Sequence, residues 1–202
     1  MRKLLGLPAA LSVASVFLAL SAVQALGATV TCGERITQST TVDNDLSGCS
    51  GFASLIVSGD NITLDLNHHT ISGDANSGIF VAGENVTVRD GTVSGFSNGN
   101  GVSIAGNGTA AFVTRMTAIG NYIGFSAIRG DTLFERNLAA DNLVDGFYAR
   151  SGPGTSVTAT FVQNRAYSNG RLGINTNRTD GGKNHAHKNG DPRQCVGVVC
   201  RP

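Results

Sequence analysis

The chain has 202 residues, of which 41% are hydrophobic and only 14% are charged, and its formal net charge is +1. This length corresponds to one domain. A nearly neutral surface does not attract phosphate backbones or anionic lipid, so the charge balance argues against a nucleic-acid-binding protein or a membrane-surface protein. The glycine content, 27 residues, shows no collagen period and indicates many tight turns.

Residues 1–25 have the pattern of a secretory signal peptide. Arg2 and Lys3 give a positive start, Leu4–Leu20 is apolar, and Val23–Ala25 offers a small residue at a cleavage position. A single membrane anchor is the alternative, but this run is rich in alanine and serine and weakly hydrophobic. We therefore expect cleavage, a secreted or cell-envelope location, and no stable membrane span afterwards. The remaining 13 basic and 14 acidic side chains give a formal charge of −1.

Residues 54–176 repeat one pattern with steps of 24, 23, 23, 22 and 27 residues. The copies start at Ser54, Gly78, Gly101, Gly124, Gly146 and Gly173. Each copy contains short alternating apolar runs split by Gly, Asn and Asp, which indicates several short strands per coil. This period predicts a solenoid whose units bury their apolar faces only against their neighbours, in three parallel sheets wound into a prism. Leucine-rich repeats share the length, but their Leu-x-x-Leu-x-Leu frame is missing.

Apolar residues recur in matching slots and predict ladders on the inward face, because side chains alternate along a strand. One column contains Ile79, Val102, Phe125, Phe147 and Ile174. Two further columns are Val88, Val113, Phe134 and Phe161, and Ile71, Val93, Ala118, Ala139 and Ala166. A polar column of Asn121, Asn142 and Asn169 is predicted to serve as turn residues, because asparagine tolerates the left-handed backbone.

The flanking segments lack this regularity. Residues 26–53 are predicted to form an N-terminal cap with a first partial coil, and residues 177–202 a polar C-terminal cap. The His185-Ala-His187 spacing would suit two metal ligands on a strand, but in a polar tail we expect solvated side chains.

The four cysteines lie in these caps and allow three pairings. We expect Cys32 to pair with Cys49 and Cys195 with Cys200, because about six coils at a strand spacing of ~4.8 Å separate the two ends by roughly 25–30 Å. Export favours oxidation over metal binding. Disulfides at both ends would protect the open ends of the stack.

The stretch Asp60-Asn-Ile-Thr-Leu-Asp-Leu-Asn-His-His-Thr-Ile-Ser-Gly73 is very similar to the opening coil of bacterial secreted β-helix repeat proteins of the pectate-lyase-like superfamily. His68 stands where that coil usually has glycine. The resemblance covers roughly residues 32–200. It implies an all-β, right-handed parallel β-helix solenoid of about six coils of 22–27 residues. It does not imply one activity, because the superfamily contains lyases, hydrolases, epimerases, adhesins and inert scaffolds.

In enzymes of this superfamily, substrate often lies along the first sheet. The outward row of that sheet is predicted to be Phe80, Ser103, Ser126, Tyr148 and Asn175. We expect Arg129, Asp131, Tyr148 and Arg150 at one edge of it. A lyase needs a base beside a uronate carboxylate and a cation to hold it. Tyr148, with Arg150 or Arg129, is therefore the candidate catalytic set, and a solvated rim with one exposed tyrosine is the alternative.

Known catalytic motifs of the superfamily are missing, including Asn-Thr-Asp, Gly-His-Gly and Arg-Ile-Lys of pectic hydrolases and Asp-Pro-His-Glu of alginate epimerases. A calcium site would need converging carboxylates. Asp65, Asp90 and Glu135 instead alternate with arginines, which predicts a charge-balanced solvent face and no cofactor, with calcium as the open alternative. We expect a non-catalytic module that binds a polysaccharide or cell-surface glycan, or is structural. A small lyase or epimerase acting on uronate-containing glycans is the alternative.

Overall fold

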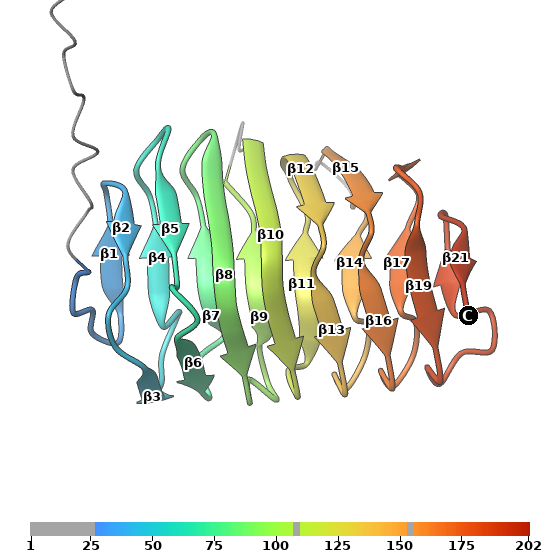
Figure 1. Ribbon diagram of the computed structural model, residues 1–202, viewed down its shortest axis with the longest axis horizontal. Coiled ribbons are helices and arrows are strands. Elements are labelled where there is room, and N and C mark those ends of the chain that lie inside the picture. The colour runs from blue at the N-terminus through green and yellow to red at the C-terminus, as the bar shows by residue number, and fades with distance from the viewer. Residues whose placement is uncertain (1–26, 107–109, 153–155) are drawn as a thin grey trace, which may run out of the picture.

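The computed structural model describes residues 27–106, 110–152 and 156–202, and the predicted signal peptide lies outside these ranges. The described chain is an all-β parallel solenoid of about 7 turns, stacked from the N-terminal end to the C-terminal end (Figure 1). This confirms the predicted β-helix architecture. The stack is about one turn longer than the repeat spacing indicated, because paired strands continue into both flanking segments.

The first sheet has 8 parallel strands, one from each successive turn. Its strands are β1 (Glu34–Ile36), β4 (Leu55–Val57), β7 (Ser77–Val81), β9 (Asn100–Ile104), β11 (Ile123–Ala127), β14 (Phe147–Ala149), β17 (Ile174–Thr176) and β20 (Cys195–Val196).

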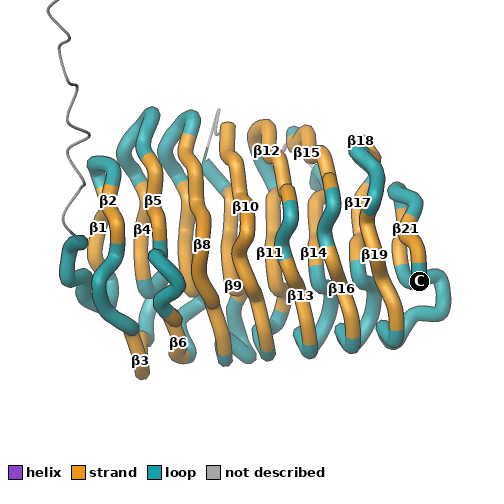
Figure 2. Tube along the Cα trace, viewed as in Figure 1, coloured by secondary structure: helices purple, strands orange, loops and turns teal. Residues whose placement is uncertain are grey.

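The second sheet has 13 strands and covers two faces of the prism. One face contains β2 (Thr40–Thr41), β5 (Thr63–Asp65), β12 (Gly130–Glu135), β15 (Val157–Val162) and β18 (Thr179–Asp180). The other contains β3 (Leu46–Cys49), β6 (Thr70–Gly73), β13 (Leu138–Ala140), β16 (Arg165–Tyr167), β19 (Asn184–His187) and β21 (Cys200–Arg201). Two long strands, β8 (Val86–Ser94) and β10 (Ala110–Ile119), run across both faces and join them (Figure 2).

The predicted apolar columns are confirmed by the strand register. Ile79 pairs with Val102, and the column continues through Phe125 and Phe147 to Ile174. In the C-terminal turns the aromatic members stack, with ring centroids of Phe125 and Phe147 4.8 Å apart. All these side chains are fully buried, and burial of such columns is the main favourable term that holds the turns together.

The predicted role of the asparagine column is wrong. Asn121, Asn142 and Asn169 are buried, and the left-handed backbone belongs to the residue before each of them. Their amides form a ladder along the solenoid: Asn121 Nδ2 donates to Asn142 Oδ1 at 3.1 Å, and Asn142 Nδ2 donates to Asn169 Oδ1 at 2.8 Å. Asn189 extends this ladder by one more turn. Each buried amide thereby has partners, which a buried polar group requires.

A second asparagine ladder of Asn137, Asn164 and Asn184 runs along the bend between the two faces of the large sheet. Together the ladders follow a spacing that occurs three times, Asn-x-Ala-x-x-Asn, at residues 137–142, 164–169 and 184–189. The alanine faces the core in each copy. In β16 and β19 the residues on either side of that alanine are at least partly exposed, whereas in β13 Leu138 is partly exposed and Ala140 is buried. In β16 and β19 this spacing therefore fixes which side chains the surface presents.

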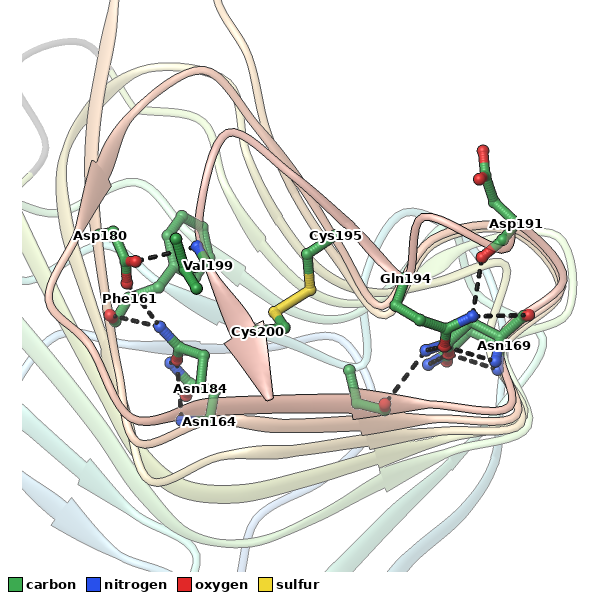
Figure 3. The surroundings of a disulfide bond; sticks show 12 residues. Phe161, Asn164, Asn169, Asp180, Asn184, Asp191, Gln194, Cys195, Val199 and Cys200 are labelled. Atoms are coloured by element: carbon green, nitrogen blue, oxygen red, sulfur yellow. Dashed lines mark hydrogen bonds between the residues drawn. A yellow bond between two sulfur atoms is a disulfide. The ribbon is translucent and has the colours of Figure 1, made fainter. Parts of the chain in front are cut away.

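Both ladders end beside the C-terminal disulfide (Figure 3). Gln194 accepts from Asn189 Nδ2 at 2.9 Å, and Asp180 accepts from Asn184 Nδ2 at 3.1 Å. Disulfides join Cys195 to Cys200 and, at the other end, Cys32 to Cys49, which confirms the predicted pairing. None of the described ranges contains a helix with the length and apolar character that a membrane crossing requires.

Candidate functional site

The predicted outward row of the first sheet is confirmed in register but offers little open surface. Tyr148 lies between Ser126 on β11 and Asn175 on β17. Ser126 and Asn175 are buried, and Tyr148 is half-buried. Arg150 donates from Nη1 to Asn175 Oδ1 at 2.8 Å, so its guanidinium already has a protein partner on this row.

A buried carboxylate organises this part of the first sheet. Asp145 is fully buried and accepts from Arg171 Nε at 2.9 Å and Nη2 at 2.6 Å, and from Asn175 Nδ2 at 2.8 Å. The bond to Asp145 raises the pKa of Arg171. A depression of about 200 Å³ beside this network is lined by Arg150, Arg171, Leu172, Asn175, Arg193 and Val196. These contacts give Arg150, Arg171 and Asn175 hydrogen-bond partners within the protein.

The predicted cluster at the edge of this sheet is only partly brought together. Tyr148 and Arg150 lie in and directly after β14, whereas Arg129 lies in the link from β11 to β12. Asp131 is wrongly placed by the sequence prediction, because it belongs to β12 of the second sheet. There it lines a different hollow of about 340 Å³ that also contains Phe112 and Leu133. Gly130 turns the chain from one sheet to the other with φ of 73°, so neighbours in sequence separate in space.

The predicted charge-balanced face is confirmed in the N-terminal turns. Arg89 Nη2 lies 2.7 Å from Asp65 Oδ2, and Arg115 Nε lies 2.6 Å from Asp90 Oδ1. The hydrogen bond from Arg115 lowers the pKa of Asp90. Within the described residues, no group of three or more His, Cys, Asp or Glu side chains is arranged to hold a metal ion.

A hollow larger than the two described above lies elsewhere, on the second sheet in the C-terminal turns. It is a groove of about 640 Å³, lined by Arg136, Asn137, Leu138, Gln163, Arg165, Tyr167, Lys183 and His185. We call it the basic groove, because it contains two arginines and a lysine and none of these lining residues is acidic. A second hollow of about 300 Å³ adjoins it and is lined by Arg165, Ala166, Tyr167, His185, His187 and Pro202.

The basic groove is built by the bend that the second asparagine ladder fixes. Arg136, Gln163 and Lys183 each directly precede a ladder asparagine and have φ of 56°, 56° and 61°. This left-handed backbone is unusual for non-glycine residues, and here each turn repeats it. The asparagine points into the core and its neighbour lies on the groove, so the buried ladder positions the polar side chains outside. Arg136 Nε also donates to Gln163 Oε1 at 2.9 Å.

Below the bend, strands β13, β16, β19 and β21 place their outward residues in rows. Leu138, Arg165, His185 and Arg201 are aligned by the strand register, as are Tyr167 and His187. The rings of Tyr167 and His187 stack in parallel with centroids 5.5 Å apart. His185 and His187 therefore lie in a strand of the solenoid rather than in an irregular polar tail.

Formal charge is segregated along the solenoid axis. Residues 27–100 contain eight acidic and two basic side chains, a net charge of −6, whereas residues 101–202 contain six acidic and eleven basic side chains, a net charge of +5. The near neutrality of the whole chain hides this difference. The basic groove lies in the positive part, where Glu135, 3.6 Å from Arg136, is a nearby carboxylate.

Sequence reasoning missed the basic groove because the apolar period ends before its last turn. The repeated Asn-x-Ala-x-x-Asn spacing was the available signal, and it would have placed Arg165, Tyr167, His185 and His187 on one outward face. Comparison of the chain with protein-family models, with curated proteins and with solved structures gives no match. The functional argument therefore depends on the geometry of this chain.

Proposed function

We propose that the protein is a non-catalytic module that binds an acidic polysaccharide in the basic groove. The observation that carries this proposal is the groove itself: it has a volume of about 640 Å³, and Arg136, Arg165 and Lys183 line it without an acidic lining residue. Arginine and lysine recognise carboxylate and sulfate groups through charge-assisted hydrogen bonds. A concave surface with several such donors holds an extended anionic ligand better than separate exposed charges do.

The repeat of the solenoid supports an extended ligand. Successive turns present Arg165, His185 and Arg201 in one aligned row, at the strand spacing of ~4.8 Å. That step is comparable to the length of one sugar unit in an extended chain, so neighbouring turns can meet neighbouring sugars. Tyr167 supplies an amphipathic ring beside the row, which suits the apolar face and hydroxyl rim of a sugar.

The disulfides indicate that the protein works in an oxidising environment outside the cytosol. Together with the signal-like N-terminal residues, this supports a secreted or cell-envelope protein, where acidic glycans are accessible. The similarity to the pectate-lyase-like superfamily is consistent with a glycan ligand and remains part of this proposal.

Equilibrium binding to polygalacturonate and to neutral dextran of similar length tests the proposal. We expect the protein to bind polygalacturonate and not to bind neutral dextran. A double variant, Arg165→Gln with Lys183→Gln, should bind about tenfold more weakly, as expected for two lost exposed ion pairs. The matched control is Arg35→Gln with Arg193→Gln, which removes the same charge outside the groove and should bind normally.

Two results would contradict the proposal. One is equal loss of affinity in the groove variant and the control variant, which would indicate diffuse attraction without a site. The other is a steady rise in the ultraviolet absorbance of unsaturated products, which would show an eliminating enzyme. Loss of that rise in Tyr148→Phe would assign the reaction to the first sheet instead.

A further inference from the structure

Two histidines occupy outward positions on one strand beside the basic groove. His185 and His187 are both exposed on β19, and Ala186 between them faces the core. His185 borders the groove, and both histidines line the adjoining hollow of about 300 Å³. Neither side chain is needed to fill the core, and the strand register fixes the direction in which both point.

The neighbouring strands surround these histidines mainly with positive charge. Strand β16 places Arg165 opposite His185 and Tyr167 opposite His187, and β21 places Arg201 on the other side of His185. Lys183 and Lys188 lie immediately before and after β19. Pro202 also lines the hollow.

We propose that the hollow at His185 and His187 is an anion subsite that operates when both histidines are protonated, so that the protein holds an acidic polymer more tightly in acidic surroundings. This inference rests on the proposed function, because it assigns the same ligand class to the surface next to the basic groove. It adds a subsite and a dependence on pH that the permanent charges of Arg136, Arg165 and Lys183 cannot provide.

The physical reason is a coupling between protons and ligand. Histidine is the side chain that gains its charge between pH 8 and pH 5. Additional positive charges beside Arg165 and Arg201 repel one another, and an anion placed between them removes that repulsion. Proton uptake and anion binding therefore strengthen each other by the same factor.

The test measures binding of dextran sulfate at pH 7.5 and pH 5.5, with neutral dextran as the blank. Sulfate esters keep their charge over this range, so a change in affinity reports on the protein. We expect roughly tenfold tighter binding at the lower pH, because two additional exposed ion pairs of ordinary strength together give about this factor in affinity. The double variant His185→Gln with His187→Gln should bind dextran sulfate with the same affinity at pH 7.5 and at pH 5.5, because the pH effect is lost.

Two further variants separate this account from a general effect of acid. His68→Gln with His69→Gln removes two histidines from an N-terminal turn and should retain the tenfold ratio. His185→Lys with His187→Lys supplies permanent charge and should bind at pH 7.5 as tightly as the wild-type protein at pH 5.5. A structural role of the histidines predicts no such gain.

The outcomes distinguish the inference from the function on which it rests. Equal wild-type affinities at both pH values, or a pH effect that survives in His185→Gln with His187→Gln, would overturn the anion subsite while leaving glycan binding intact. No binding of dextran sulfate at either pH would overturn both. Tighter binding of a single-stranded DNA of equal charge than of dextran sulfate would also overturn the assignment, because the ligand would then be a nucleic acid.

Discussion

The N-terminal and C-terminal turns share one backbone but differ in core and surface. The N-terminal core consists mainly of aliphatic residues such as Leu64 and Ile79, and on its surface Arg89 is paired with the carboxylate of Asp65. The C-terminal core contains stacked phenylalanines and two asparagine ladders, and its surface carries a basic groove. The repeat therefore specifies the fold everywhere, while the residues between the repeated positions distinguish a paired face from a binding face.

The largest effect is expected from breaking an asparagine ladder. Asn142→Ala removes the side-chain oxygen that accepts two hydrogen bonds from Asn121. It also removes the amide nitrogen that donates to Ala118 O and Asn169 Oδ1, and all three partner residues are buried. Unpaired buried polar groups cost ~1–3 kcal/mol each, so we expect a loss of about 4 kcal/mol in the free energy of unfolding. Chemical denaturation followed by circular dichroism measures it.

The control for the ladder is an asparagine of the N-terminal turns. Asn85 is exposed and bonds only to Asn61 in the described contacts, but its φ is 53°, which alanine tolerates less well than asparagine does. Asn85→Ala should therefore lower stability by only about 1 kcal/mol. Equal losses in Asn85→Ala and Asn142→Ala would contradict the special role of the ladder in the C-terminal turns.

The two disulfides compare the ends of the solenoid. Their cysteines are 17 residues apart at the N-terminal end and 5 apart at the C-terminal end. Because a longer closed loop restricts the unfolded chain more, Cys32→Ser with Cys49→Ser should lower stability by about 3 kcal/mol, and Cys195→Ser with Cys200→Ser by about 2 kcal/mol. Thermal unfolding of the two variants shows which one loses more stability. A larger loss in Cys195→Ser with Cys200→Ser would show that native contacts at the C-terminal end outweigh loop closure.

The smallest effect concerns the paired face. The pKa of Asp90 is lowered by Arg115, so its contribution to stability is present above the unfolded-state pKa near 4 and is lost as the pH falls through the lower folded-state value. Arg115 is 45% exposed, which keeps this contribution below about 1 kcal/mol. At pH 7, Asp90→Asn should be less stable than the wild-type protein by this contribution, and near pH 2 the two proteins should be equally stable. A stability difference that grows on acidification would contradict this assignment.

Much of the fold could be predicted from the sequence, because apolar columns such as Val88, Val113 and Phe134 recur at a nearly constant step and alternate as strands do. The disulfides followed from the positions of the cysteines at the two ends. The candidate site is harder to predict from the sequence. A repeat defines which residues share a column, but not where a bend such as that at Gly130 transfers the chain to another sheet, and Asp131 was misplaced for that reason.

The basic groove depends on the bend before each ladder asparagine, where a left-handed residue turns outward. Arg136, Gln163 and Lys183 share this backbone without sharing a residue type, so no single-residue pattern indicates it. The sequence predicts turn positions for these asparagines because that is the commonest role of the residue. Here the hydrogen bonds between turns are decisive, and they become visible only when successive turns are stacked.

The measurement that tests the central claim most directly is an NMR titration of the isotope-labelled protein with an oligogalacturonate. Binding in the basic groove predicts shifts concentrated in residues 136–138, 163–167 and 183–187, with little change around Tyr148 or in residues 34–90. Shifts centred on Tyr148 and Asn175, or spread evenly over the chain, would contradict the account, because they would place the ligand on the first sheet or show that the basic groove is not a site.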